Sequence, residues 1–309
     1  MKRITIFGGS GFIGRHLVRE LKDDYRITVL SRNPDKVKGL HDDSVEIVKF
    51  DYSDPDLLIP LFEISDIIIN LAGVNVGSRW TENTKKAIKN SRLDTDKMII
   101  EAFGVCIDKP EVIIQGSGMG VYGFDPSDEE VTEKSPLGTS GFLTEVGIAH
   151  EEILEPLKDK TRLIHLRTGL VLHGKEGSLP KMAASFKMFL GGPMGSGRQW
   201  TSWIHIKDEV RAIRFLMENE NAAGPFNLTA PYPVRNSEFS VALGKALYRP
   251  SWLHTPASFL HLMMKDMADE LLLGGLKIVP ERLLKKGFRF EFEHIEGALK
   301  DLYAEKYIP

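Results

Sequence analysis

The residues with the clearest chemistry in this chain are three glycines near its start. Gly8, Gly11 and Gly14 recur at every third position after a short apolar run, ITIF. Such glycines make a tight turn, admit a pyrophosphate to the backbone and let a helix pack closely on a strand. Free N–H groups at the start of the helix then hold the phosphates. The stretch therefore predicts a dinucleotide site formed by Gly8, Ser10, Gly11, Phe12, Ile13 and Gly14.

Arg32 predicts which dinucleotide this site prefers. A carboxylate at the end of the second strand would favour NAD, whereas an arginine favours the 2′-phosphate of NADP. This chain has Ser31, Arg32 and Asn33 there, and a guanidinium fork suits a phosphate. The alternative is a solvated arginine on a loop. We expect NADP(H), with Ser31 and Arg32 at its adenosine end.

Two further segments have the composition of cofactor contacts. Asp51 follows the third expected strand, where it can meet the adenine edge, although aspartates also commonly cap turns. Leu71, Ala72 and Gly73 follow the fourth, at the strand end where open parallel sheets bind ligands. Small residues there allow a cofactor to approach closely.

The elements that position these residues alternate as strands and helices, which is the pattern of a parallel sheet. Apolar β-prone runs predict six strands, and the longest helical pattern covers about 82–103. The strand predictions are Ile4–Phe7, Ile27–Ser31, Val45–Phe50, Asp66–Leu71, Glu111–Gln115 and Arg162–Arg167. The fold class is therefore α/β, a doubly wound parallel (Rossmann) sheet.

The alternation of strands and helices fails after Val171, where glycines, prolines and aromatic residues cluster instead. We expect an NADP(H)-binding domain over 1–170, with a return segment at 206–229 that adds a helix and a strand. Residues 171–309 are expected to form mainly a smaller substrate-side region.

Composition excludes several classes of function. The 309 residues carry 40 basic and 43 acidic side chains, a net charge of −3, so no basic face for nucleic acid is expected. No apolar run is long enough to span a membrane. The single cysteine, Cys106, forbids an internal disulfide and fits the reducing cytoplasm. We expect a cytoplasmic protein with a small-molecule substrate.

Several strings resemble a known family. GGSGFIG at the glycine turn, NLAG at the fourth strand, VYG at 121–123 and LRTG at 166–169 are similar to extended short-chain dehydrogenases/reductases. RWT at 79–81, Ser91-Arg92, FLTEV at 142–146 and GGPMGSGRQWTSWIHIKD at 191–208 narrow the resemblance. They are similar to the atypical "epimerase family protein" group that includes the bacterial YfcH proteins. The resemblance adds Arg92 to the expected cofactor contacts.

The resemblance extends to the end of the chain. NLTAPYPV at 227–234 and MADELLLGGLKIVPERLLKKGFRF are also similar to that group. The latter string resembles its small C-terminal domain, here about 250–303. The resemblance therefore implies the same fold class as the strand pattern, with an oxidoreductase or epimerase activity.

One part of the wider family's machinery is missing. Extended reductases use a tyrosine as acid/base and a lysine four residues later that lowers its pKa. At the usual interval from Tyr122, these positions fall on Leu143 and Gly147, and no Tyr-x-x-x-Lys occurs in the chain. Leucine and glycine cannot transfer a proton.

Three residues are candidates to replace this pair. Ser117 and Tyr122 follow the fifth strand, where the nicotinamide should lie. For Tyr122, the sequence favours a role in shaping the pocket over a catalytic one. Glu145 lies on the next helix and can act as acid/base if burial raises its pKa; the alternative is a solvated or paired carboxylate. His150 is expected on an exposed helical turn.

The later aromatic region offers candidates for the substrate cleft. They are Arg198, Trp200, Trp203 and His205, and the alternative for the aromatic residues is a place in the core. Asp208 is expected to be the N-terminal cap of the following helix or to lie in its first turn, a structural role. His205 has no neighbour at metal-ligand spacing, so no metal site is predicted.

Two functions remain open from the sequence. The first is an NADP(H)-dependent oxidoreductase or epimerase on a small polar substrate, with an unusual proton donor. The second is a non-catalytic module that binds NADP(H) as a sensor or regulator. A substrate-side region favours the enzyme, and the missing Tyr-x-x-x-Lys favours the sensor. The sequence leaves the substrate and the oligomeric state open.

Overall fold

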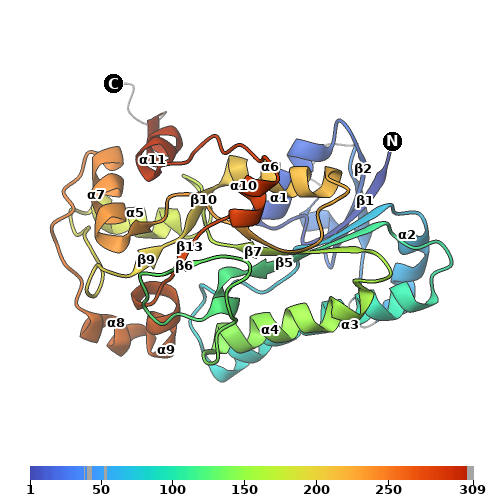
Figure 1. Ribbon diagram of the computed structural model, residues 1–309, viewed down its shortest axis with the longest axis horizontal. Coiled ribbons are helices and arrows are strands. Elements are labelled where there is room, and N and C mark those ends of the chain that lie inside the picture. Colours follow the sequence, from blue (N-terminus) through green and yellow to red (C-terminus); the bar gives the residue numbers. More distant parts are fainter. Residues whose placement is uncertain (38, 40–43, 52–53, 305–309) are drawn as a thin grey trace. The chain divides into compact units, whose positions relative to one another are not determined.

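The fold was analysed in a computed structural model (Figure 1), which describes residues 1–37, 39, 44–51 and 54–304. The strands in chain order are β1 (Arg3–Phe7), β2 (Arg26–Ser31), β3 (Glu46–Lys49), β4 (Ile67–Asn70), β5 (Val112–Gly118), β6 (Glu130–Val131), β7 (Arg162–Thr168), β8 (Leu170–Leu172), β9 (Trp200–Thr201), β10 (Trp203–His205), β11 (Gly224–Leu228), β12 (Val234–Arg235) and β13 (Lys277–Ile278).

The α-helices are α1 (Phe12–Leu21), α2 (Ile59–Glu63), α3 (Glu82–Val105), α4 (Phe142–Leu154), α5 (Leu179–Lys187), α6 (Ile206–Glu218), α7 (Asn236–Leu247), α8 (Ala257–Met264), α9 (Asp266–Ala268), α10 (Glu281–Lys285) and α11 (Ile295–Ala304). Short 3-10 turns are η1 (Pro34–Lys36), η3 (Pro55–Leu58), η4 (Met119–Tyr122) and η5 (Glu155–Leu157), and η6 (Asp269–Leu273) is a π-helical turn.

The chain divides into two compact units, which interleave along the sequence. Unit 1 consists of 1–117, 146–166 and 210–226, and unit 2 consists of 118–145, 167–209 and 227–309. The chain passes between the two units after residues 117, 145, 166, 209 and 226. Unit 2 also contains 118–145, which lies inside the predicted first domain. Part of the return segment predicted at 206–229 belongs to unit 1.

The central sheet has seven strands in the order β11-β7-β5-β4-β1-β2-β3. The pairs β2–β3, β1–β2, β1–β4 and β4–β5 are parallel. The predicted doubly wound Rossmann fold is confirmed. Strand order reverses between β1 and β4, and open α/β sheets bind ligands at such a switch point. The glycine turn, which follows β1, lies at this switch point, where β1 and β4 end.

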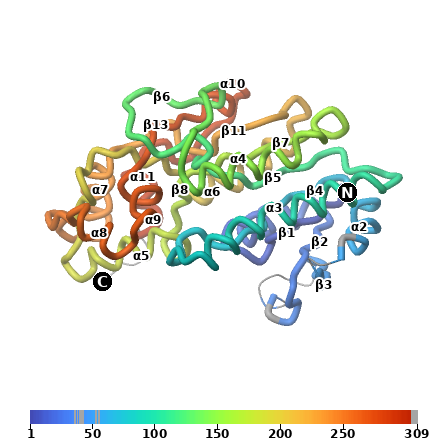
Figure 2. Tube along the Cα trace, turned by 90° about the horizontal axis from the view of Figure 1, so that it is seen from below, coloured from blue at the N-terminus to red at the C-terminus, as the bar shows by residue number. Residues whose placement is uncertain are grey.

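In unit 1, helices cover both faces of the sheet (Figure 1). Helix α3 and the later part of α4 lie on one face and α1 on the other, and the trace in Figure 2 also draws α3 and α4 side by side. The five residues of β1 show why this strand is central: only Arg3, the first of them, is exposed. A strand buried on both faces reads as a continuous apolar run rather than as an alternating one.

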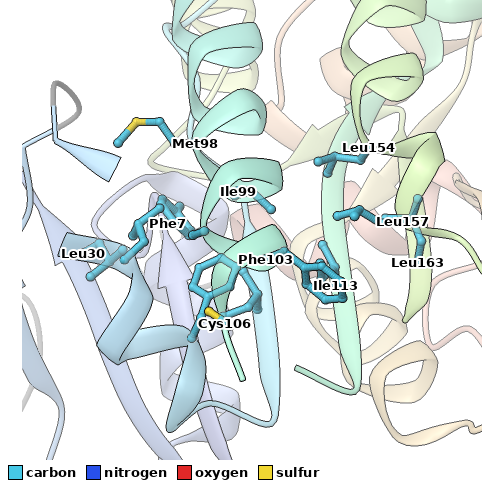
Figure 3. Close-up of a cluster of buried hydrophobic side chains, with 14 of the residues drawn as sticks. Phe7, Leu30, Met98, Ile99, Phe103, Cys106, Ile113, Leu154, Leu157 and Leu163 are labelled. Carbon is cyan, nitrogen blue, oxygen red and sulfur yellow. The ribbon is translucent and has the colours of Figure 1, made fainter. Parts of the chain in front are cut away.

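A hydrophobic cluster under α3 anchors this layer (Figure 3). Phe7 of β1 packs edge-on against Phe50 with ring centroids 5.8 Å apart, and Phe103 of α3 is 1% exposed in the same cluster. Cys106 lies there too and is 4% exposed. Burial raises the pKa of its thiol above the ordinary value. A buried thiol of this kind is a packing residue rather than a nucleophile.

Unit 2 has its own core, in which α5, α7 and α11 enclose Trp203 of β10 and Phe239 of α7, both at most 1% exposed. Its C-terminal segments also bind its earlier ones. The Glu270 carboxylate accepts hydrogen bonds from the N–H groups of Phe142 (2.7 Å) and Leu143 (2.8 Å), in the first turn of α4. Glu270 thus supplies the cap for that helix from a distant part of the chain.

Candidate functional site

The glycine turn joins β1 to α1 with little room for side chains. Gly8 has φ of +75°, and a Cβ built on it would lie 2.6 Å from the carbonyl oxygen of Leu71. A Cβ on Gly14 would lie 2.2 Å from the carbonyl oxygen of Gly8. Both distances are far below van der Waals contact and both neighbours are backbone atoms. Glycine is therefore required at both positions, and the ends of β1 and β4 touch.

The start of α1 is free to bind an anion. Gly11 is the N-cap; within the described chain no side chain caps this end, and the first turn holds no acidic residue. The first N–H groups of a helix have no partner inside it, and the helix dipole favours negative charge there. The glycine turn and the first turn of α1 therefore have the geometry of a phosphate cradle.

The end of β4 is held by its own last residue, Asn70, and by side chains of α3. The Asn70 Oδ1 atom accepts a hydrogen bond from the N–H of Ala72 (3.0 Å), and the Ser91 Oγ atom accepts one from Val74 (2.9 Å). The Arg92 guanidinium lies against Gly73, where an added Cβ would be 3.0 Å from its Cζ atom. Burial lowers the pKa of Arg92 below its ordinary value. The structure thus brings Arg92 next to Gly73, in the segment Leu71–Gly73.

The adenosine-end candidates lie at the ends of the next two strands. Ser31 is the last residue of β2 and is 7% exposed; its Oγ atom accepts a hydrogen bond from Asn33 N–H (3.2 Å). Arg32 follows it and is exposed, and Asp51 is exposed shortly after β3. Because β2 and β3 are parallel neighbours, both residues lie at the same edge of the sheet.

Ser117 lies at the end of β5, in the strand beside β4. Its Oγ atom donates a hydrogen bond to Oε1 of Glu151 on α4 (2.7 Å). Glu151 is 7% exposed, whereas Ser117 is only partly buried. A Cβ on the preceding Gly116 would lie 3.0 Å from a Leu71 side-chain carbon, so the ends of β4 and β5 are also in contact. The hydroxyl is thus held beside the expected cofactor segments by a buried carboxylate.

The Tyr122 side chain is bound by other residues of unit 2. Its hydroxyl donates to Asn227 Oδ1 (2.7 Å) and accepts from Arg167 Nη1 (2.9 Å), and the Arg167 guanidinium lies over its ring, 4.9 Å from the centroid. The side chain is 6% exposed. These contacts favour the pocket-shaping role that the sequence left open for Tyr122.

Two expectations for α4 are wrong. Glu145 lies in the first turn and is exposed, so it lacks the apolar burial on which its predicted acid/base role depended. His150 was expected on an exposed turn but is 1% exposed. The two residues are five positions apart and lie on different faces of the helix, and the sequence alone had assigned those faces in the wrong order.

His150 belongs to a buried polar cluster that the sequence analysis missed. It lies against Asp96 of α3, and Gln115 of β5 donates to Oδ2 of the same carboxylate (2.7 Å). His165 Nδ1 and Gln115 Oε1 are 2.6 Å apart on the neighbouring strands β7 and β5. One feature of the sequence indicates this cluster: a polar residue ends or interrupts an apolar run, Gln115 in VIIQ and His165 in LIHL.

The later aromatic candidates prove to be mainly structural. Trp203 and His205 are at most 1% exposed, and His205 is stacked on Phe292 with ring centroids 4.0 Å apart. Burial lowers the pKa of His205 to about 4. Asp208 lies in the first turn of α6, which is one of the two structural positions predicted for it. Its carboxylate also accepts hydrogen bonds from a distant loop, at the N–H groups of Glu291 (2.9 Å) and Phe292 (2.8 Å).

Comparison with known proteins gives the same assignment from a different direction. Residues 4–229 match the model of the NAD dependent epimerase/dehydratase family, and 255–302 match a domain of unknown function. The chain belongs to the NAD dependent epimerase/dehydratase family. The resemblance seen in the sequence is thereby confirmed, together with its C-terminal domain.

Relatives in this epimerase family match over their whole length. An epimerase family protein of Staphylococcus epidermidis is 37% identical over 306 residues, which are 98% of this chain and 99% of the relative. The epimerase family protein YfhF of Bacillus subtilis is 33% identical over 305 residues, with 98% of each chain covered.

Among solved structures, the human epimerase family protein SDR39U1 (isoform 2) with NADPH has a TM-score of 0.86 at 30% identity. The alignment covers 98% of this chain and 99% of the human chain. A dTDP-glucose 4,6-dehydratase of Bacillus anthracis in complex with NAD matches with a TM-score of 0.77 at 17% identity, a likeness of fold alone.

None of the described helices combines the length and the hydrophobicity that a membrane span requires.

Proposed function

We propose that this chain is an NADP(H)-dependent oxidoreductase or epimerase that acts on a small polar substrate, with Ser117 as its proton-transferring hydroxyl. The observation that carries the proposal is the bond between Ser117 and the buried Glu151 at the end of β5. This bond lies at the end of β5, which is next to β4 in the sheet. The end of β4 touches the glycine turn, which has no room for side chains at Gly8 and Gly14. The turn leads into α1, whose N-cap makes no side-chain hydrogen bond within the described chain. A cofactor cradle and a hydroxyl with a carboxylate behind it are the parts that alcohol–carbonyl chemistry needs.

The residues of the cradle fit a nicotinamide dinucleotide. The N–H groups at the start of α1 would hold the pyrophosphate, and the end of β4 would hold the part nearer the reacting ring. When bound, the nicotinamide supplies hydride transfer. The preference for NADP(H) rests on the exposed Arg32 at the end of β2. It is also in keeping with the NADPH named for the human relative.

Ser117 and Glu151 replace the missing tyrosine and lysine in this proposal. During oxidation of a substrate alcohol, the hydroxyl proton passes to Ser117 Oγ while the Ser117 proton passes to Glu151 Oε1. During reduction of a carbonyl both transfers reverse, so the substrate oxygen receives its proton from Ser117. Ser117 gains one proton and loses one, so it is neutral before and after each transfer. Glu151 becomes a carboxylic acid during oxidation, when it holds the proton released by the substrate, and returns to a carboxylate during reduction.

The second candidate is a non-catalytic NADP(H)-binding sensor, which the absent Tyr-x-x-x-Lys favours. The two candidates separate in one experiment. Purified protein is titrated with NADPH by fluorescence and then incubated with NADPH and a panel of small polar aldehydes, ketones and sugars. Consumption of NADPH above the protein-free rate supports the enzyme. Tight NADPH binding without turnover supports the sensor, and no binding overturns both.

Arg32→Ala is expected to weaken NADP(H) binding about tenfold to a hundredfold, because a charge-assisted hydrogen bond contributes roughly 1.5–3 kcal/mol. NAD(H) lacks the 2′-phosphate, so its affinity should change little. The measurement is a pair of titrations of wild-type and variant protein. Arg19→Ala is the control, since it removes an exposed arginine of the same unit at the other end of α1. Equal losses for both cofactors would show that Arg32 does not bind the phosphate.

A cytoplasmic location forms part of the proposal. Its basis is the single cysteine, which is buried and unpaired with another thiol. Proteins of oxidising compartments commonly use disulfides, whereas reducing compartments keep thiols free. We propose a small molecule as the partner, with no role for nucleic acid.

A further inference from the structure

A continuous line of hydrogen bonds crosses unit 1 beneath the proposed site. It begins at Ala72, whose N–H donates to Asn70 Oδ1 (3.0 Å), and Asn70 Nδ2 donates to Asp96 Oδ1 (2.9 Å). Asp96 Oδ2 meets Nδ1 of His150, and His150 Nε2 lies 3.2 Å from the carbonyl oxygen of Gly116. Gly116 precedes Ser117. The line therefore joins the end of β4 to the end of β5 through α3 and α4.

The partners of this line fix the direction of its hydrogen bonds. A carbonyl oxygen can only accept, so Nε2 of His150 carries a proton and donates to Gly116. Asp96 accepts two amide N–H groups, from Asn70 and Gln115. Both Asp96 and His150 are at most 1% exposed.

Stability alone is a poor reason for a buried polar pair. Removing polar groups from water is costly, and well-packed apolar residues of similar volume commonly stabilise a core as well or better. What such a pair adds is direction, because each polar group fixes the hydrogen bonds of its neighbours. Here those neighbours are the Ala72 and Gly116 backbones, which border the expected cofactor contacts and Ser117.

We propose that Asp96 and His150 are positioning residues that hold the cofactor-side end of β4 and the Ser117 end of β5 in register. The inference rests on the proposed function, in which Ser117 is the reacting hydroxyl. His150 holds the peptide bond before Ser117, while Glu151, the next residue on the helix, binds the Ser117 hydroxyl. One helical turn thus fixes both the backbone and the side chain of that serine. Asp96 holds His150 and, through Asn70, the Ala72 N–H.

Two isosteric substitutions of His150 separate positioning from packing. Glutamine places its amide near Nε2 and keeps a donor for Gly116, whereas asparagine places its amide near Nδ1 and loses that donor. A catalytic group misplaced by about 1 Å can cost a hundredfold in rate. His150→Asn should lower turnover roughly tenfold to a hundredfold, whereas His150→Gln should stay within roughly threefold of wild type.

Thr95→Val is the matched control, because it removes a buried hydroxyl beside Asp96 whose hydrogen bond within the described chain is to the Ser91 carbonyl oxygen of the same helix, α3. All rates are compared well below the unfolding temperature, so that a loss of stability alone does not reduce the folded fraction. Equal rates in the two His150 variants, whether both low or both normal, would overturn the positioning role.

Two readouts do not depend on turnover. Nitrogen-15 NMR of the histidine rings should show Nε2 of His150 protonated in the wild-type protein, because the Gly116 carbonyl can only accept. A ring protonated at Nδ1 alone would contradict the proposal. Asp96→Asn should weaken NADPH binding by roughly tenfold, since Asn70 and the Ala72 N–H lose their anchor. Unchanged NADPH affinity in a folded Asp96→Asn protein would also overturn it.

These results separate the failure of this inference from failure of the proposed function. If no compound is turned over, the enzyme proposal fails, while the NMR and NADPH measurements still test the buried pair. If Asp96→Asn does not fold, Asn70→Ala tests the same link from its other end. It should likewise weaken NADPH binding, and normal affinity would count against the proposal.

Discussion

Ser117→Ala is expected to lower turnover by about 10²–10⁴ while leaving NADP(H) affinity nearly unchanged. Positioned acid/base groups contribute about that factor to proton-transfer reactions. The Ser117 hydroxyl bonds to Glu151 and does not belong to the glycine turn, so its loss leaves the phosphate cradle intact. An interaction used only in the transition state lowers kcat and kcat/KM together. The measurement is steady-state turnover beside an NADPH titration.

Tyr122→Phe is the comparison for Ser117→Ala, because it also removes one hydroxyl. That hydroxyl is bonded to Asn227 and Arg167, so its loss should reduce stability more than turnover. Glu151→Gln should resemble Ser117→Ala, because glutamine cannot take the serine proton. If Ser117→Ala turned over a known substrate at the wild-type rate, the proton would have to come from elsewhere, and the sensor proposal would gain.

Glu209→Gln is expected to stabilise the protein increasingly as pH rises. Glu209 is 1% exposed, and its only hydrogen bond within the described chain is from Thr168 Oγ1 to its Oε1 atom (3.0 Å). Burial raises its pKa from 4.5 to about 8. Between these values the unfolded chain releases a proton that the folded chain retains. The free energy of unfolding therefore falls by about 1.4 kcal/mol per pH unit from this group.

Glutamine has the same shape and does not ionise, so the variant lacks this loss. The difference between variant and wild type should be small below pH 4.5, grow up to about pH 8, and then level off at no more than about 5 kcal/mol. Urea unfolding at several pH values measures it. Glu145→Gln removes an exposed carboxyl and controls for net charge. A variant curve parallel to wild type across this range would show that Glu209 is ionised in the folded protein.

The fold could be predicted from the sequence because its strands are buried on both faces. Such strands appear as short apolar runs, and β1, β2 and β7 lie within a residue or two of their predictions. The clearest difference is β5, which was predicted to end at Gln115 but continues to Gly118. Gly116 and Gly118 conceal this extension, because glycine is a weak strand former and was taken as the start of a loop.

The cofactor side of the site depends on local geometry, which is why glycine spacing predicted it. The catalytic side depends on which face of α4 meets the sheet. Glu145 and Glu151 are chemically identical residues on one helix, and only the packing against β5 shows that Glu151 meets Ser117. His150 depends in the same way on Asp96, a residue of another helix. No periodicity within α4 contains that information.

The bond from Glu270 to the first turn of α4 bears on how this protein could have been assembled from modules. The two family matches, 4–229 and 255–302, divide the chain into two segments that could be exchanged between relatives. Yet the first turn of α4, the helix that carries His150 and Glu151, is capped by a carboxylate of the second segment. A chimera that took its C-terminal segment from a donor without an acid at this position would keep every cofactor residue. Its helix α4, which carries the proposed proton acceptor Glu151, would however lose the carboxylate that accepts from the N–H groups of its first turn. An acid at residue 270 and the start of α4 therefore have to be inherited together, although 128 positions of sequence separate them.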